Sequence, residues 1–167
     1  LEKIRTCKTS AQLLGLEGEA AAVYFSVFDE LILQQKEDFT FQGRNRRPPL
    51  DNVNAMLSFA YSLLTGMCGS ALESVGLDAY VGFFHTDRPG RISLALDIME
   101  ELRSIMADRF VLTMINKRII KKSHFIQKES GAVVLTDEGR KLFLSAWQER
   151  KKELITHPFL DEKIEWG

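Results

Sequence analysis

Residues 52–76 read NVNAMLSFAYSLLTGMCGSALESVG, and this apolar stretch decides the fold. Its apolar side chains recur every three or four positions, as they do in a helix with one buried side. These positions are Val53, Met56, Leu57, Ala60, Leu63 and Leu64. The spacing predicts a long core helix that begins at about Asn52, continues past Gly66 and ends near Val75. Gly76 is then in place to stop the helix, because glycine adopts the left-handed conformation common at helix ends.

The same periodicity predicts a helix before this stretch. Thr9 or Ser10 is suited to cap its N-terminus, because a short hydroxyl side chain accepts a hydrogen bond from the first turn. Gly15 and Gly18 weaken the turns that follow. They predict a break in the helix, or a close backbone approach, near Glu17.

Two further helices and a hairpin are predicted after the core helix. Ser93 is expected to cap a helix that runs beyond Asp108, and Thr136 or Asp137 to cap a last helix. Between them, apolar runs flank a Glu-Ser-Gly turn in residues 125–135, which is typical of a small β-hairpin. The predicted fold class is therefore mainly α, a bundle-like helical domain with one small hairpin near residues 125–135.

The bulk composition limits the classes of function. A chain of 167 residues with 45% hydrophobic content suits one domain with a real core. A formal net charge of −1 excludes a globally basic nucleic-acid binder, so any DNA contact must rest on local charge. Cys7 and Cys68 form neither a disulfide framework nor a zinc motif, which favours a reducing cytoplasm. No apolar stretch is expected to span a membrane, and the opening at Leu1 indicates a piece of a longer protein.

A few polar residues stand out in the apolar pattern. Asp97 and Glu100 are three positions apart on a predicted helix, so their carboxylates lie on one edge and repel unless a cation or proton joins them. His85 lies in a loop after two phenylalanines, and Glu17 precedes a strongly apolar helix face. From the pattern alone, solvated surface charges and a hydrogen-bonded histidine explain these residues better than a metal site does.

Four ordered blocks of sequence change this interpretation. Residues 15–25 read GLEGEAAAVYF, residues 76–85 read GLDAYVGFFH, and residues 91–103 read RISLALDIMEELR; the remaining block covers residues 44–61. Together they resemble the C-terminal domain of the CRISPR-associated spacer-acquisition integrase and endonuclease, the first of the numbered Cas proteins. The blocks follow the order of that family and cover nearly the whole chain. The departures, such as Ala79 where proline is common, do not fall on a ligand position.

The resemblance implies a divalent-metal site. Glu17, His85 and Glu100 match the family's metal-binding catalytic residues, and Asp97 matches the neighbouring acid, as a further ligand or a supporting carboxylate. The implied cofactor is Mn²⁺ or Mg²⁺, and an imidazole among the oxygen ligands favours Mn²⁺.

The resemblance also implies a reaction and its partners. The reaction is phosphoryl transfer on DNA: a 3′-hydroxyl of spacer DNA attacks a phosphodiester at the edge of a CRISPR repeat. Residues 1–167 are expected to form a single C-terminal α-helical catalytic domain, in a chain that lacks the family's N-terminal β-rich domain. Expected partners are DNA, the second numbered Cas protein and, in the full-length family, a second copy of the protein. The expected location is the cytoplasm of a prokaryote, with no membrane partner.

Basic residues are the expected contacts for DNA phosphates. The arginine- and proline-rich loop that contains Arg46 and Arg47 is the first candidate, because a loop can close over a strand; Lys117 and Lys121 mark the second. Arg103 is expected to bind phosphate or to pair with a carboxylate. Each basic cluster is also compatible with an ordinary solvated surface. The alternative function is accordingly a non-catalytic helical module that binds DNA or a protein partner.

Overall fold

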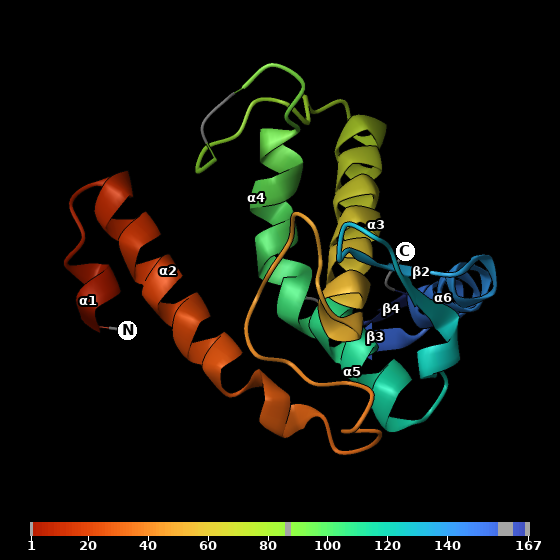
Figure 1. The fold of residues 1–167 in the computed structure, drawn as a ribbon. Helices are drawn as coiled ribbons and strands as arrows, with labels where there is room; N and C mark the ends of the chain where they lie inside the picture. Colours follow the sequence, from red (N-terminus) through yellow and green to blue (C-terminus); the bar gives the residue numbers. More distant parts are fainter. Residues whose placement is uncertain (1, 86–87, 157–161, 166–167) are drawn as a thin grey trace.

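The computed structural model describes residues 2–85, 88–156 and 162–165. The α-helices are α1 (Glu2–Arg5), α2 (Ser10–Ser26), α3 (Asn52–Ser74), α4 (Ser93–Leu102), α5 (Arg109–Asn116) and α6 (Asp137–Lys151). The strands are β1 (Phe125–Gln127), β2 (Val133–Leu135), β3 (Leu154–Thr156) and β4 (Lys163–Glu165). In Figure 1, α3 and α4 lie side by side at the centre, α2 stands to one side and α6 to the other. The mainly helical fold expected from the sequence is confirmed.

Helix α3 is the central element of the core. The side chain of Asp51 caps it by accepting a hydrogen bond of 2.7 Å from the backbone N–H of Asn54. The helix ends at Ser74, and Gly76 follows with a φ of 77°, as its sequence predicts. By length and composition α3 is apolar enough to cross a membrane, with a mean hydropathy of 1.4. The expectation that no stretch of the sequence is long and apolar enough was therefore wrong. Its buried side packs into the protein core, which accounts for this composition.

Helix α2 is continuous from end to end. Thr9 caps it by accepting a hydrogen bond of 3.3 Å from the backbone N–H of Gln12, as expected. The predicted break or close approach near Glu17 is wrong. A methyl group added at Gly15 or Gly18 would meet nothing within 4 Å, so neither glycine is needed for packing and neither interrupts the backbone. A 3₁₀ turn, Phe28–Leu31, follows the helix.

The helix that begins at Ser93 also differs in detail from the expectation. Ile92, not Ser93, occupies the cap position, and Ser93 is the first helical residue, wholly buried. Helix α4 passes through a π-helical segment, Arg103–Asp108, into α5, so the chain stays helical beyond Asp108 as predicted. This long helical segment packs along α3 and carries part of the site described below.

The predicted hairpin is present as the antiparallel pair β1 and β2, with Ile126 opposite Val134. Thr136 caps α6 by accepting a hydrogen bond of 3.0 Å from the backbone N–H of Gly139. Strands β3 and β4 form a second antiparallel pair that the sequence reasoning did not predict. These strands are only three residues long and lie in a segment rich in charge, so they lack the apolar alternation that would mark them.

Aromatic side chains join the helices in the core. Phe110 of α5 meets Phe143 and Trp147 of α6 edge-on, with ring centroids 5.1 and 5.2 Å apart. Phe28 packs on Phe41 at 4.9 Å, which anchors the end of α2 to the loop before α3. These contacts hold together the part of the protein from α3 to α6, called the body below. Helix α2 is held mainly at its C-terminal end.

Candidate active site

A large cleft lies between α2 and the body of the protein. Its volume is about 1820 Å³, and residues of α2, α3, α4 and the loops before α3 and α4 line it. All three predicted metal ligands are among these lining residues: Glu17 from α2, His85 from the loop before α4, and Glu100 from α4. Residues 68 and 15 positions apart in sequence therefore face one space.

Asp97 holds the loop that presents His85. Its side chain is fully buried, and its Oδ2 accepts hydrogen bonds from the backbone N–H groups of Phe83 (2.8 Å) and Phe84 (3.0 Å). Its Oδ1 accepts from the backbone N–H of His85 at 2.9 Å and lies 2.6 Å from His85 Nδ1. Burial alone would raise the pKa of Asp97, but these hydrogen bonds hold the pKa below its ordinary value.

This arrangement assigns different tasks to Asp97 and His85. Both oxygens of Asp97 are occupied by donors, so the carboxylate positions its neighbours. Because an ionised carboxylate only accepts hydrogen bonds, His85 Nδ1 donates and Nε2 remains as the acceptor. A histidine whose Nδ1 is held by a carboxylate in this way is oriented for metal binding through Nε2.

Gly82 allows the loop to approach α4 closely. A Cβ at this position would lie 2.6 Å from Ser93 Cβ and 3.0 Å from Asp97 Oδ2. Only glycine therefore fits between the loop and the first turns of α4. The same close approach covers Ser93, the first residue of α4, which is wholly buried.

Glu100 lies in an environment of mixed charge. Its Oε2 pairs with Arg103 Nη1 at 2.5 Å. Burial raises the pKa of Glu100, the charge of Arg103 lowers it, and the charge of Glu17 raises it further. The two glutamates thus repel each other, and a cation between them would relieve that repulsion.

The residues present fit a divalent ion in chemistry, with two carboxylates and an oriented imidazole. The three side chains, however, lie farther apart than ligands that surround one metal ion. Within residues 2–85, 88–156 and 162–165, no three His, Cys, Asp or Glu side chains are grouped closely enough to hold one metal ion. The structure therefore brings the predicted ligands to one cleft but not into one coordination sphere.

A cluster of two tyrosines around Asp108 was not foreseen from the sequence. Asp108 is wholly buried, and it accepts hydrogen bonds from Tyr24 Oη at 2.9 Å and Tyr61 Oη at 2.5 Å. Burial raises the pKa of Asp108, and burial and the Asp108 charge raise the pKa of both phenols. The signal that could have revealed it is an acidic residue at an apolar helix position, between Ala107 and Phe110.

Arginines surround this cluster. The Arg44 guanidinium donates to Asn54 Oδ1 (2.6 Å) and Ser58 Oγ (3.0 Å), and lies 5.2 Å from the centre of the Tyr61 ring. Arg103 faces the same ring at 5.7 Å. Asn54, Ser58 and Tyr61, which lie on one side of α3, thus position Arg44 beside the cleft.

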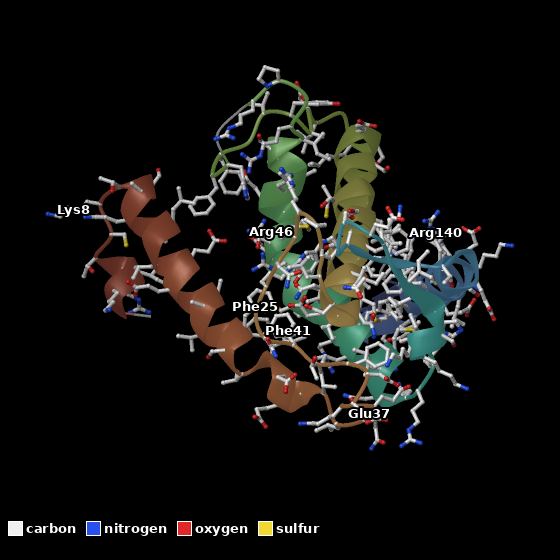
Figure 2. All side chains as sticks on the ribbon, viewed as in Figure 1. Lys8, Phe25, Glu37, Phe41, Arg46 and Arg140 are labelled. Carbon is white, nitrogen blue, oxygen red and sulfur yellow. The ribbon has the colours of Figure 1, made fainter. Side chains whose placement is uncertain are left out.

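The predicted DNA-binding residues fall into two groups. Arg46, Arg47 and Arg103 line the cleft, together with Arg44, which belongs to the same predicted basic cluster as Arg46 and Arg47. Arg88 and Arg91 also line it, and neither was predicted as a DNA contact. Figure 2 shows Arg46 on the loop between α2 and α3, and Arg140 on the side of α3 away from α2. Lys117 and Lys121 are exposed, at the end of α5 and just beyond it, and do not line the cleft.

Solved structures share this helical fold. A CAS1 protein from Thermotoga maritima superposes with a TM-score of 0.83 at 33% sequence identity, covering 91% of this chain and 48% of that one. A casposase bound to integration product superposes with a TM-score of 0.87 at 30% identity, covering 99% of this chain and 46% of that one. The fold is thus of the class found in a CAS1 protein and a casposase.

The sequence comparison defines the family. Residues 1–149 match the family described as CRISPR associated protein Cas1, and the chain belongs to this family. CRISPR-associated endonuclease Cas1 2 of Rhodospirillum rubrum is 59% identical over 93% of this chain. CRISPR-associated endonuclease Cas1 1 of Chlorobaculum tepidum is 50% identical over the full chain. The chain spans 45% and 49% of these relatives, about half of their length.

Proposed function

We propose that this chain is the metal-dependent endonuclease and integrase domain of a protein that acquires CRISPR spacers. The observation that supports this proposal is the cleft that Glu17, His85 and Glu100 line together with six arginines. Asp97 holds His85 in place there. In the proposed reaction a DNA 3′-hydroxyl attacks a phosphodiester. A new phosphorus–oxygen bond forms as the bond to the leaving 3′-oxygen breaks.

Glu17, His85 and Glu100 are the proposed ligands of Mn²⁺ or Mg²⁺, with Mn²⁺ favoured by the imidazole. When bound, the ion would act as a Lewis acid on the phosphate and assist deprotonation of the attacking hydroxyl. Asp97 keeps His85 in the tautomer whose Nε2 is free. Arg103 partly neutralises Glu100, which lowers the cost of keeping this half-buried carboxylate ionised.

The arginines of the cleft are the proposed contacts for DNA. Arg46 and Arg47 are exposed on the loop before α3, and Arg103, just after α4, also lines the cleft. A guanidinium binds phosphate oxygens in pairs, so arginines spaced along a cleft can follow a DNA strand. Lys117 and Lys121 lie outside the cleft and are proposed as a second, weaker contact surface.

The proposed partners are DNA, the Cas2 protein and a second copy of the protein. Similar solved structures include a partial Cas6-RT-Cas1–Cas2 complex and a casposase bound to integration product, which supports Cas2 and DNA as partners. Within the longer relatives, this chain is proposed to be the C-terminal catalytic domain. Its relatives include proteins of Rhodospirillum and Chlorobaculum, which supports the cytoplasm of a prokaryote as its location.

A second candidate is a non-catalytic module that binds DNA through the arginine-lined cleft. It is favoured by one observation: among the residues that the structure describes, no three potential ligands are grouped for a metal ion. Glu100 and Glu101 allow a direct test, because they are adjacent and only Glu100 lines the cleft.

The test is Mn²⁺-dependent strand cleavage of a branched DNA that mimics a half-integrated spacer. We expect the native chain and Glu101→Ala to cut the branch, and Glu17→Ala, His85→Ala and Glu100→Ala to lose cutting while remaining folded by circular dichroism. Equal cutting by Glu100→Ala and Glu101→Ala would remove Glu100 from the active site. If the native chain binds branched DNA without cutting it, and still does not cut when joined to the part of its longer relatives that it does not span, the binding module is established.

A further inference from the structure

Glu17 lies on helix α2, which is loosely attached to the body. None of its 17 residues is buried in the core. Its apolar anchor is at the C-terminal end, where Phe25 packs on Phe41 at a centroid distance of 5.7 Å. The position of Glu17 therefore depends on the few contacts that hold this end of the helix.

One polar contact reaches from α2 into the core. Tyr24 Oη donates to Asp108 Oδ2 at 2.9 Å, and Asp108 has no exposed surface. The other oxygen of Asp108 accepts from Tyr61 of α3 at 2.5 Å, so the carboxylate is itself held in place. A hydrogen bond to a buried, fixed carboxylate is stronger and more directional than a surface contact.

This hydrogen bond affects the position of Glu17 through the geometry of α2. Glu17 and Tyr24 are seven residues apart in one continuous helix, which is about two turns, so they lie on the same side about 10 Å apart along the axis. A change in the angle of α2 at Tyr24 therefore moves Glu17 towards or away from the opposite wall of the cleft. That wall carries His85 and Glu100.

We propose that Tyr24 is a positioning residue: its hydrogen bond to Asp108 fixes the angle of α2 and thereby the distance of Glu17 from His85 and Glu100. The part of this inference that concerns metal binding rests on the proposed function. The part that concerns α2 rests only on the contacts of Tyr24. One proposed metal ligand lies on α2 and two lie on the body of the protein, and this hydrogen bond joins the two parts. Its loss therefore weakens metal binding without removing a ligand.

Tyr61 supplies the matched control. Tyr24→Phe and Tyr61→Phe each remove one hydroxyl from the same carboxylate and keep the ring, but only Tyr24 lies on α2. Amide hydrogen exchange is measured without metal or DNA, with the amides of α6 as the reference for global stability. We expect exchange in α2 to rise about tenfold in Tyr24→Phe, and to stay within about twofold of the native rate in Tyr61→Phe. Equal exchange of α2 in the two variants would overturn the proposal.

A Mn²⁺ titration followed by electron paramagnetic resonance tests the consequence for Glu17. We expect half-saturation to need about tenfold more Mn²⁺ in Tyr24→Phe, and less than threefold more in Tyr61→Phe. Unchanged Mn²⁺ affinity in a Tyr24→Phe protein whose α2 has loosened would refute the positioning of Glu17. Absence of Mn²⁺ binding in the native chain would refute the proposed function instead, and the exchange experiment would still decide the role of Tyr24.

Discussion

At the level of single residues, Asp97 accounts for most of the local geometry of the candidate site. One buried carboxylate orders three successive backbone N–H groups and the ring of His85. The sequence showed an acidic residue one helical turn before Glu100, but it left open whether Asp97 is a ligand or a support. In the structure both oxygens of Asp97 accept hydrogen bonds from the loop, an arrangement that depends on how the loop folds over α4.

Gly82→Ala should destabilise the protein because its Cβ would meet Ser93 Cβ at 2.6 Å. We expect a loss of about 1–3 kcal/mol in the free energy of unfolding, measured by urea denaturation. Gly66→Ala is the control, since nothing lies within 4 Å of its Cβ. In the middle of α3 this change should be neutral or stabilise by up to about 1 kcal/mol. Equal effects of the two changes would contradict the close approach of loop and helix.

Asp108 makes a pH-dependent contribution to stability. Burial raises its pKa in the folded state above the ordinary carboxyl value, so the folded protein holds this proton to higher pH than the unfolded chain does. Stability contributed by Asp108 is therefore lost as pH rises from the ordinary carboxyl range to the raised pKa. Asp108→Asn lacks this titrating group. As pH rises over that interval, the free energy of unfolding of the native chain should therefore fall relative to that of Asp108→Asn. Urea denaturation from pH 4 to 8 measures this difference. Parallel pH profiles would show that the Asp108 pKa is not raised.

At the level of elements, the long helices were predictable because their patterns are local. Asp51, the apolar side of α3 and Gly76 define one helix in the sequence and in the structure. Helix α2 was predicted in extent, but its two glycines were interpreted as a break. Nothing lies within 4 Å of a Cβ added at either glycine, and this lack of contacts depends on the tertiary structure, which no local pattern reveals. The Tyr24–Asp108 contact joins residues 84 positions apart, so it too needed the folded structure.

Gly15→Ala should stabilise α2, because the helix is regular there and the added methyl group meets nothing within 4 Å. We expect a gain of about 0.5–1 kcal/mol, visible as slower amide exchange in α2. The matched control is Gly76→Ala, at a φ of 77°, where the same change should destabilise by about 1 kcal/mol. Faster exchange in Gly15→Ala would mean that α2 requires a glycine at this position.

For the whole molecule, family resemblance identified the ligand candidates, while the distribution of charge needed the structure. The chain has a net charge of −1, yet six arginines line one cleft. Arg46, Arg47 and Arg103 were predicted as DNA contacts together with Lys117 and Lys121, and only the arginines line the cleft with the candidate ligands. Sequence distance cannot show this separation, because Arg103 is closer in the chain to Lys117 than to Arg46.

Arg46→Ala should weaken DNA binding and reduce its dependence on salt. A phosphate contact contributes about 0.9 to the slope of log affinity against log salt for duplex DNA, so we expect the slope to fall by about that amount. Fluorescence anisotropy at several salt concentrations measures it, with Lys117→Ala as the comparison. A larger change in Lys117→Ala than in Arg46→Ala would move the main DNA surface away from the cleft.

The central claim is that the cleft binds a divalent metal through His85, and Mn²⁺ binding followed by electron paramagnetic resonance tests it most directly. His124 provides the control, because its Nδ1 accepts a hydrogen bond of 3.1 Å from the backbone N–H of Lys121 and it does not line the cleft. We predict saturable binding in the native chain and in His124→Ala, and loss of that binding in His85→Ala. Equal Mn²⁺ affinity in His85→Ala and the native chain, or no saturable binding in the native chain, would contradict the account.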